Sequence, residues 1–517
     1  MQLQGIELNQ DNNLGATERH TIDMADSSTT RLRREKLTAA IAVGLLMMVF
    51  SILAEAQAPA TSGAPPGSSG EDSSTPALAP TVDQNAFNGS VPEGQATTQV
   101  LQISFADAID RGLRNNLGLL LQSDNTLAAR GQRWKELSNL LPNINANVSE
   151  NVLQTNLQAE GLRFPGFPKV IGPFGFFDAR AYATQSVFDW HAIQRERGAA
   201  ERERTLQYNY KDARDLVVLV VGNGYLVAIA QAARVETSEA QVRTSQALYD
   251  KAVDQQKAGV TPAIDTLRSQ VELQSRQQQL IVARNNYAKQ KLALARIIGL
   301  PPGQEFVLTE KAPYAPLTTL SLAENLQRAY TSRSDYLAAA QQVRSAERFR
   351  AAATAEHYPS LGIAANYGDI GITPANSHGT FSASATLNIP IFQGGKAHAD
   401  VLQAEASLRQ AQQQLGDLRG RIDYEVRTAL LDLAAAAEQV EVARSSVQLA
   451  DEALTQARDR FSAGVTDNLE VVQAQESVAS ANESYISSLY AHNLAKVSLA
   501  RAIGFAEQGV KQYLQSR

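Results

Sequence analysis

The residue types that most often perform chemistry in proteins are scarce or scattered along this chain. No cysteine occurs, which excludes disulfides, zinc–thiolate sites, thiol nucleophiles and a lipid-modified cysteine anchor. No G-x-S-x-G or P-loop motif occurs either. No two histidines have the spacing of a zinc motif, and the six are His20, His191, His357, His378, His398 and His492. We therefore expect no enzyme activity and no catalytic, cofactor-binding or metal-binding residue.

Two carboxylates have a more informative setting, because each follows the same Gly-Val-Thr turn. Asp265 follows Gly259-Val260-Thr261, and Glu470 follows Gly464-Val465-Thr466. A glycine suits the left-handed end of a helix, and an acid in the first turn of the next helix is favoured by the helix dipole. Thr261 with Pro262 suits an N-cap followed by a proline at the first helical position. The pattern predicts two helical hairpins with tips at about 259–262 and 464–467, and capping alone can explain the glycines.

The two tips belong to an internal repeat, which must position them in equivalent ways. Residues 259–300 align without a gap onto 464–505, and both copies close with Leu-Ala-Arg-x-Ile-Gly. Upstream, Ser104-Phe105-Ala106-Asp107 matches Ser321-Leu322-Ala323-Glu324. We predict one pseudo-symmetric structure with a first repeat at 102–300, a connector at 301–320, a second repeat at 321–506 and a C-terminal tail at 507–517.

Residues 1–56 have the pattern of an N-terminal extension followed by a secretory signal peptide. Basic residues at 31–36 precede an apolar run at 37–54, and Ala54-Glu55-Ala56 suits cleavage. A single membrane-anchor helix is the alternative interpretation of the apolar run. Residues 57–101 are rich in Pro, Gly and Ser, and a segment of this composition cannot bury enough apolar surface to fold. We expect them to form a disordered tail.

Each repeat also contains two segments with the alternation of β-strands, at about 143–153, 177–188, 360–369 and 380–391. In the last of them, Phe381, Ala383, Ala385 and Leu387 alternate with small polar residues. This alternation is typical of a transmembrane strand, although a half-buried sheet in a soluble protein shows it too. The export signal, the small polar face and the aromatic residues that flank the strands favour the membrane.

Four strands are too few to close a barrel, and an open sheet edge in lipid leaves backbone groups without hydrogen bonds. Two copies would supply eight strands, whose interior side chains fill, whereas three copies would supply twelve and leave a lumen. We therefore expect a homotrimer surrounded by outer-membrane lipid.

The segments that lead to the tips, at about 190–258 and 394–461, predict unusually long coiled-coil helices. Apolar residues recur every seven positions in the second, at Val426, Leu433, Val440, Val447, Leu454 and Phe461. The uncharged stretch 216–233 could cross a membrane by composition, but its counterpart in the repeat is charged, so we interpret it as buried helix packing. The expected fold class is mainly α with a β-barrel part.

The overall composition argues against two other classes of protein. With 44% hydrophobic and 19% charged residues, the chain is too polar for a polytopic helical membrane protein. Its 47 Lys and Arg against 53 Asp and Glu give a net charge of −6 without a basic face, so we expect no nucleic-acid partner.

Taken in order and in duplicate, these motifs resemble the TolC family of outer-membrane efflux factors over residues 101–506. The motifs that carry the resemblance are Ser-Phe-Ala-Asp-Ala-Ile at 104–109, Leu141-Pro142, Pro-Ile-Phe-Gln-Gly-Gly-Lys at 390–396, Arg-Phe-Ser-Ala-Gly at 460–464 and the Leu-Ala-Arg-x-Ile-Gly endings. The resemblance implies a trimeric 12-stranded barrel continuous with an α-helical tunnel, in the bacterial outer membrane and extending into the periplasm. Such a protein passively conducts substrates from an inner-membrane pump and a periplasmic membrane-fusion adaptor to the outside. A periplasmic coiled-coil scaffold or tether without channel activity is the alternative.

The same resemblance assigns roles to the tips. It implies that the adaptor docks on residues of the two turns, namely Gly259, Val260, Thr261, Arg460, Phe461, Gly464, Val465 and Thr466. It also implies that Asp265, Glu470 and Gln473 lie at the periplasmic entrance, near an acidic constriction. Gln473 is neutral at a position where the family often has an acid, and the first tip has Gln256-Lys257 in place of an arginine and an aromatic residue.

Overall fold

The computed structural model describes residues 84–159, 161, 165–166, 168–310, 314–317, 320–466 and 468–509. All of these residues lie in one of the two compact units of the chain, Leu78–Arg517. The predicted signal peptide at 1–56 lies outside the described residues, as do residues 57–83 of the predicted tail and residues 510–517 of the C-terminal tail.

The first repeat begins with short elements and ends in a long helical hairpin. In chain order its elements are η1 (Gln84–Asn88), β1 (Leu101–Ile103), α2 (Phe105–Asn115), α3 (Leu117–Ser138), β2 (Asn143–Asn156), β3 (Val170–Phe188), α4 (Trp190–Lys257) and α5 (Ala263–Ile298).

The described part of the second repeat has the same order of strands and helices, but it has no counterpart of η1 and it has a 3-10 turn between its two long strands. These elements are β4 (Phe306–Leu308), α6 (Leu322–Ser332), α7 (Ser334–Ala355), β5 (Ser360–Gly371), η2 (Pro374–Asn376), β6 (Ser377–Asn388), α8 (Lys396–Ser462) and α9 (Asn468–Ala502). Equivalent helices also start in the same way, because Ser104 with Asp107 and Ser321 with Glu324 each form a capping box.

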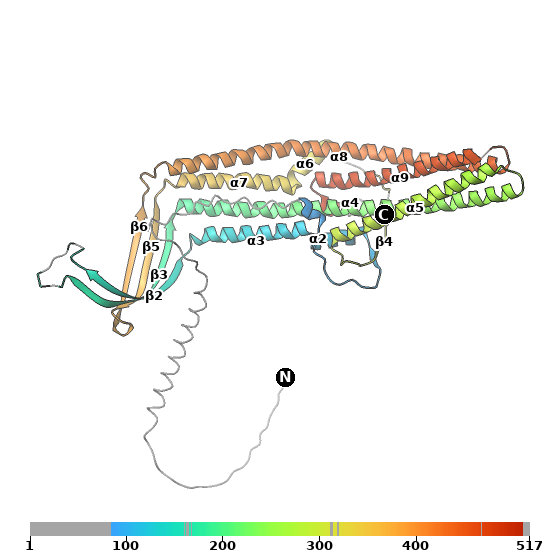
Figure 1. Cartoon of the computed structure of the whole chain (residues 1–517). Helices are drawn as coiled ribbons and strands as arrows, with labels where there is room; N and C mark the ends of the chain where they lie inside the picture. The colour runs from blue at the N-terminus through green and yellow to red at the C-terminus, as the bar shows by residue number, and fades with distance from the viewer. Residues whose placement is uncertain are drawn as a thin grey trace, which may run out of the picture. The chain divides into compact units, whose positions relative to one another are not determined.

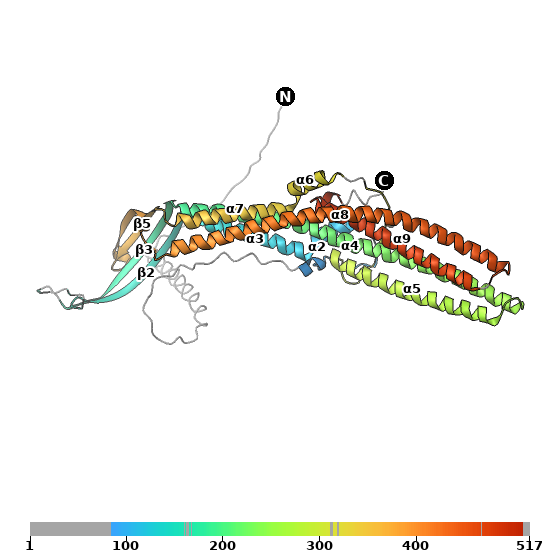
Figure 2. The same ribbon diagram turned by 90° about the horizontal axis from the view of Figure 1, so that it is seen from above.

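Two long helical hairpins dominate the described part of the chain. Helices α4 and α8 have 68 and 67 residues, and α5 and α9 return along them with 36 and 35 residues. At 1.5 Å per residue, α4 and α8 are each about 100 Å long. Helices α3 and α7 lie beside the other half of α4, nearer the strands, and α7 also packs on α8 (Figures 1 and 2).

The heptad pattern predicted along the second hairpin forms its packing seam. In α8 the side chains of Val426, Leu433, Val440, Leu454 and Phe461 are buried. Most of the alanines three positions further along are buried too, namely Ala429, Ala436, Ala443 and Ala457. Small residues at these positions let α8 and α9 approach closely, as in a coiled coil. The seven-residue repeat therefore explains why α8 packs along this one face.

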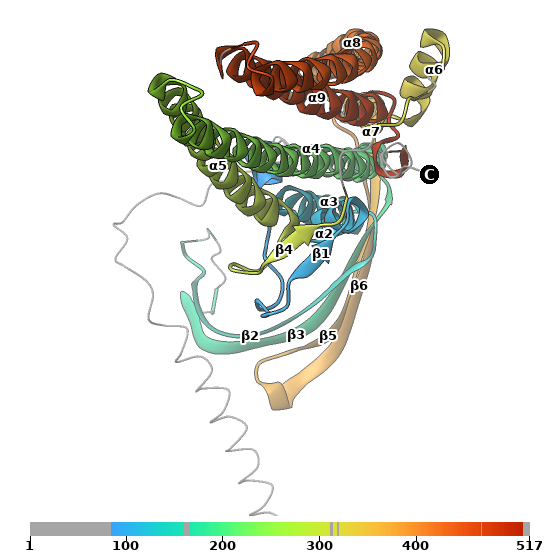
Figure 3. The same cartoon turned by 90° about the vertical axis from the view of Figure 1, so that its right-hand side faces the viewer.

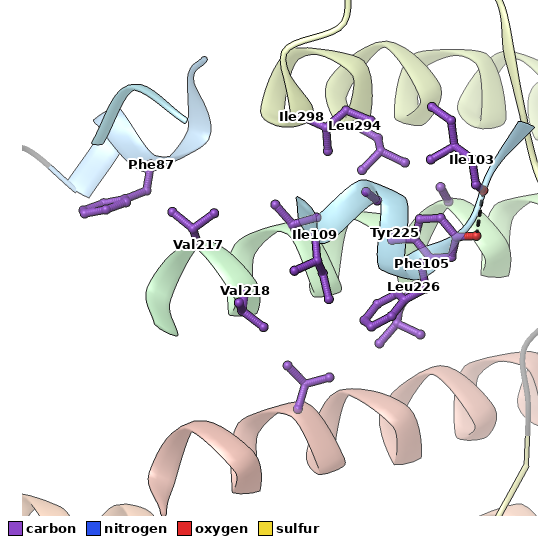
Figure 4. Close-up of a cluster of buried hydrophobic side chains, with 14 of the residues drawn as sticks. Phe87, Ile103, Phe105, Ile109, Val217, Val218, Tyr225, Leu226, Leu294 and Ile298 are labelled. Carbon is purple, nitrogen blue, oxygen red and sulfur yellow. Dashed lines mark hydrogen bonds between the residues drawn. The ribbon is translucent and has the colours of Figure 1, made fainter. Parts of the chain in front are cut away.

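The largest hydrophobic core lies in the middle of the helical part, where the two repeats meet. It surrounds the apolar stretch of α4, with Val217, Val221 and Tyr225 packed against α2 and the ends of α5 and α9 (Figure 4). The Tyr225 hydroxyl donates a hydrogen bond of 3.1 Å to the Ile103 carbonyl. The three-residue strands β1 and β4 pair in parallel beside this core and join the repeats.

Among the described residues, α4 is the helix that is long and apolar enough to cross a membrane by length and composition. Its apolar window is partly buried inside the protein, and Val217, Val218 and Val221 have no exposed surface. The prediction that residues 216–233 serve buried helix packing agrees with this placement.

The four long strands form one antiparallel sheet in the order β2-β3-β5-β6, which is curved (Figure 3). The sheet adjoins the ends of α3, α4, α7 and α8, since each of these helices continues directly into or out of a strand. Strands β2 and β6 are its two edges, and within the described chain neither has a partner on its outer side.

All four long strands differ at an end from the sequence-based expectation. Strand β2 continues to Asn156, three residues beyond its predicted end. Strand β3 starts at Val170, seven residues before the predicted start, and this extension pairs with β2 from Asn151 to Asn156. Strand β5 continues to Gly371. Strand β6 covers 377–388 and not 380–391, because Pro390 lacks the amide hydrogen that the ladder needs. Ile391 and Phe392 are exposed beyond the end of β6.

Candidate functional site

The turn between α4 and α5 closes the first hairpin and is shaped by Gly259. This glycine has a φ of 72°, and the amides of Gly259 and Val260 donate to the carbonyls of Gln256 and Gln255 at 3.0 and 2.9 Å. Such bonds satisfy the last carbonyls of a helix and are the ordinary role of a left-handed glycine. The prediction that Thr261 caps α5 is wrong, because Pro262 occupies the N-cap position and the helix begins at Ala263.

The turn between α8 and α9 has the same backbone and an additional ionic contact. Gly464 has a φ of 73°, and the Val465 amide donates to the Arg460 carbonyl at 3.0 Å. Arg460 Nη1 lies 2.8 Å from Glu470 Oε1, and Thr466 Oγ1 donates to Glu470 Oε2 at 2.6 Å. Glu470 therefore ties the start of α9 to the end of α8.

The two tips lie at the same end of the helical part and expose apolar side chains there (Figure 2). Val260 is 68% exposed and Val465 is 71% exposed. Phe461 differs from its predicted role as a contact residue, because it is only 3% exposed and packs among Leu248 and Val471. The heptad position that Phe461 occupies places it in the seam, so its side chain supports the tip from inside.

A buried asparagine joins the two hairpins just above the tips. Asn468 has no exposed surface, and its amide nitrogen donates to Ser269 Oγ at 2.5 Å and to the Asp265 carbonyl at 3.3 Å. Ser269 Oγ in turn donates to the Asp265 carbonyl at 3.0 Å. These bonds cross from α9 to α5, so they hold the first turns of these two helices together.

A buried arginine makes a second bridge between the same two helices, about two turns further from the tips. Arg276 of α5 contacts Glu272 on its own helix at 2.6 Å and Glu476 on α9 at 2.5 Å. The guanidinium is almost wholly buried, and Nη1 also donates to Gln279 Oε1 at 3.0 Å. Separation of α5 and α9 would break the contact between Arg276 and Glu476, so this ion pair ties the two helices together.

The three residues predicted at the entrance occupy different settings in the protomer. Asp265 is buried in the first turn of α5, and its carboxylate lies 3.5 Å from Arg268. Glu470 is paired with Arg460, whereas Gln473 is exposed. Both carboxylates thus have a basic partner within the protomer.

Asn468, Ser269 and Arg276 are not among the residues predicted from the sequence, although the repeat contained a signal for them. In the alignment of 259–300 with 464–505, Asn468 stands opposite Ala263, Ser269 opposite Ala474 and Arg276 opposite Ala481. A polar residue in one copy facing alanine in the other marks a place where the two hairpins differ. Contacts between hairpins are such a place, because they cannot be the same for both copies.

At the other end of the helices, the sheet has two faces of opposite character. On the outer face, Ile144 is 73% exposed and Phe381 is 79% exposed, and both are apolar. The residues in register on the inner face are polar and small, such as Asn145, Asn366 and Ser382. A hollow of about 440 Å³ opens beside this inner face at its helical end. Apolar residues outside and polar residues inside are the arrangement of a transmembrane barrel wall.

The described residues contain no cluster of His, Asp and Glu that could hold a metal ion. His492 is wholly buried, and burial lowers its pKa to about 4. Its ring lies 5.2 Å from that of Tyr314, and Lys496 Nζ donates to the Ala315 carbonyl at 2.5 Å. These buried groups contact the connector between the repeats, which is a structural role.

Comparison with known proteins identifies relatives of this arrangement. The family model for outer membrane efflux proteins matches residues 113–300 and 325–505, one segment in each repeat. The alkaline protease secretion protein AprF of Pseudomonas aeruginosa is 24% identical over 316 residues, which are 57% of this chain and 63% of AprF. The toluene efflux pump outer membrane protein TtgC of Pseudomonas putida is 24% identical over 427 residues, which are 77% of this chain and 82% of TtgC.

Solved structures agree with these relatives at the level of the fold. The open state of the MtrE outer membrane channel of Neisseria gonorrhoeae superposes with a TM-score of 0.66 at 18% identity, over 85% of this chain and 98% of MtrE. The predicted fold class, mainly α with long coiled-coil hairpins and a β-barrel part, is thereby confirmed. The family model covers well over half of the chain. The chain therefore belongs to the outer membrane efflux protein family, and it serves in the outer membrane as the channel component of an efflux or secretion system.

Proposed function

We propose that three copies of this chain form one continuous, passive exit duct, a twelve-stranded barrel followed by a helical tunnel. The observation that carries the proposal is the sheet of four strands with two unpaired edges and an exposed apolar outer face. In lipid, each unpaired backbone group costs several kcal/mol, so β2 and β6 need partners from other copies. Twelve strands leave a lumen lined by the polar inner face, whereas eight would be filled by side chains.

The helices support the same assembly. Helix α5 exposes Ile264 and Val271, and α8 exposes Leu431, Val442 and Leu449. These apolar side chains lie away from the buried seam of each hairpin. Contact between neighbouring copies would bury these side chains, and burial stabilises the assembly by about 25 cal/mol per Å² of apolar area.

The relatives support a duct without a substrate site of its own. They are named for cargoes as different as alkaline protease and toluene. A chain that conducts whatever a pump delivers needs a wide polar lumen and not a tailored pocket. We infer that an inner-membrane pump selects the cargo and that a periplasmic adaptor joins the pump to this chain.

Conductance tests the duct directly. Purified protein added to a planar lipid bilayer should produce stepwise, ohmic current increases, because each inserted trimer adds a water-filled path. A periplasmic scaffold or tether would bind or aggregate without current. Absence of steps from protein that migrates as a folded trimer would refute the duct.

The tips are the surface that we propose for adaptor docking. They carry exposed apolar side chains at the end of the helices remote from the sheet, with Arg460 half exposed beside them. Val260 and Val465 are mostly exposed at this surface and a side chain added at Gly464 would meet open space, whereas Phe461 supports the surface from within. A small apolar centre with a charged neighbour is typical of a protein interface.

Replacing Val260 and Val465 with aspartate should abolish efflux while trimers still form. The charge would have to be desolvated at the contact, which costs about 2 kcal/mol or more and weakens docking at least about 30-fold. Tolerance to exported compounds in cells with the variant as sole copy measures the effect. Val100→Asp, at an exposed site directly before β1 and outside both tips, is the matched control. Normal tolerance with both tip variants would refute docking at the tips.

The bonds between α5 and α9 are the closure that we propose at the periplasmic entrance. Asn468 and Arg276 join α5 and α9, the returning helices of the two hairpins, close to the tips. Opening the tunnel requires these helices to separate. The bonds would then act as a latch for the closed state.

Asn468→Ala should raise the open probability in bilayers. Loss of buried hydrogen bonds costs the closed state about 1–3 kcal/mol, which changes the closed-to-open ratio by about 5- to 150-fold. The control is Asn482→Ala on the same helix, because the Asn482 amide donates to Val478 within α9 at 2.9 Å. Equal open probabilities for the two variants would show that the asparagine latch does not hold the entrance closed.

A further inference from the structure

Strand β3 places three large polar side chains next to one another on the inner face of the sheet. Asp178, Arg180 and Tyr182 occupy alternate positions of one strand, so their side chains share a face. Their register partners on β2 are Ser149, Asn147 and Asn145, all on the polar face described above. This is the face that becomes the lumen wall in a closed barrel.

The three side chains hold one another in fixed positions. Arg180 forms a two-pronged ion pair with Asp178, in which Nε donates to Oδ1 at 2.7 Å and Nη2 donates to Oδ2. The same guanidinium lies over the Tyr182 ring, 5.4 Å from its centre. Asp178 is buried although it stands in a sheet with an open face. A planar guanidinium bound on both sides is less mobile than an isolated arginine, so this cluster is a defined feature of the wall.

The neighbouring strands leave space around the cluster. Across from Arg180 stand Gly368 on β5 and Thr380 on β6, and across from Tyr182 stand Asn366 and Ser382. Across from Asp178 stand Ile370 on β5 and His378 on β6, which are larger than the residues across from Arg180 and Tyr182. The β3 side chains therefore project furthest from the wall at the levels of Arg180 and Tyr182.

We propose that the Asp178, Arg180 and Tyr182 side chains, one set from each copy, form a charge-compensated layer of the barrel interior whose balance of charge sets the ion selectivity of the duct. The proposal rests on the three-copy duct proposed above. Three aromatic and guanidinium groups narrow the lumen at one level. The paired carboxylate and guanidinium cancel each other, so the intact layer has little net charge and little preference for cations or anions.

Removing one partner of the ion pair should therefore reveal the charge of the other. Asp178→Asn leaves three guanidinium groups around the axis and should make the channel anion-selective. Arg180→Gln leaves three carboxylates and should make it cation-selective. Reversal potentials in a KCl gradient across a planar bilayer should shift in opposite directions, with permeability ratios changed on the order of twofold to tenfold. Tyr182→Ala should increase the single-channel conductance.

Matched controls lie on the outer face of the same strands. Asp369 and Tyr367 lie on this face beside Gly379. A Cβ atom placed on Gly379 would lie 3.6 Å from the Asp369 carboxylate and 3.8 Å from the Tyr367 hydroxyl. Asp369→Asn and Tyr367→Ala also remove a carboxylate and a phenol ring, but from residues on either side of Gly368, whose side of the sheet is the inner one. These two variants should leave the reversal potential and the conductance unchanged. The double variant Asp178→Asn with Arg180→Gln restores neutrality, so its reversal potential should return to that of the natural chain.

The outcomes separate this inference from the duct itself. If the natural chain conducts and the inner variants form trimers with unchanged reversal potential and conductance, the selective layer is refuted while the duct stands. If outer and inner variants shift the potential equally, the assignment of faces is refuted. If the single variants fail to assemble, the double variant and Tyr182→Ala decide, because neither leaves an unpaired charge. A natural chain that inserts without conducting would refute the duct first.

Discussion

The unpaired edges of the four-stranded sheet are the constraint on which the rest of the structure depends. Strands β2 and β6 present backbone groups that no described residue of the same chain satisfies, and water cannot satisfy them inside a lipid bilayer. Association of copies is the solution that also explains the two faces of the sheet. Apolar side chains on the outer face meet lipid, and the small polar ones on the inner face line the space that twelve strands enclose.

The helical part follows from the same association. The strand pair β2 and β3 leads into α4, and the pair β5 and β6 leads into α8, each helix being about 100 Å long. A ring of strands therefore imposes a ring of helices. The seam of alanines keeps the second hairpin thin, and the apolar residues outside the seam remain available for neighbouring copies. At the far end, glycine turns and the bonds of Asn468 and Arg276 fix how the two hairpins of one protomer meet.

Much of this could be predicted from the sequence because the repeat presents most signals twice. Alternation of apolar and polar residues identified the strands, and apolar residues at every seventh position identified the helical seam. The Gly-Val-Thr motif identified the tips. The extension of β3 was missed because Val170–Phe176 combines a proline, two glycines and two aromatic residues without alternation. The contact of Asn468 with Ser269 could not be predicted, because the pairing of residues so far apart in the sequence depends on the register of two helices. The Asp178–Arg180 pair lies within one strand and was missed, although the strand prediction places both side chains on one face. Phe461 was predicted both as a member of the heptad seam and as a contact residue of the turn, and its heptad position determines its burial.

The complete absence of cysteine provides the most direct measurement of the central claim, that copies pool their strands. Within one chain β2 and β6 are separated by β3 and β5, about 14 Å apart, which is beyond the reach of a disulfide. Cysteines introduced in pairs along Asn145 to Ser149 and Ser382 to Ser384 can therefore link only different copies. Under oxidation in the outer membrane, we predict covalent dimers and trimers at one register. Cross-linking that stops at dimers, or fails at every register in folded protein, would contradict the account.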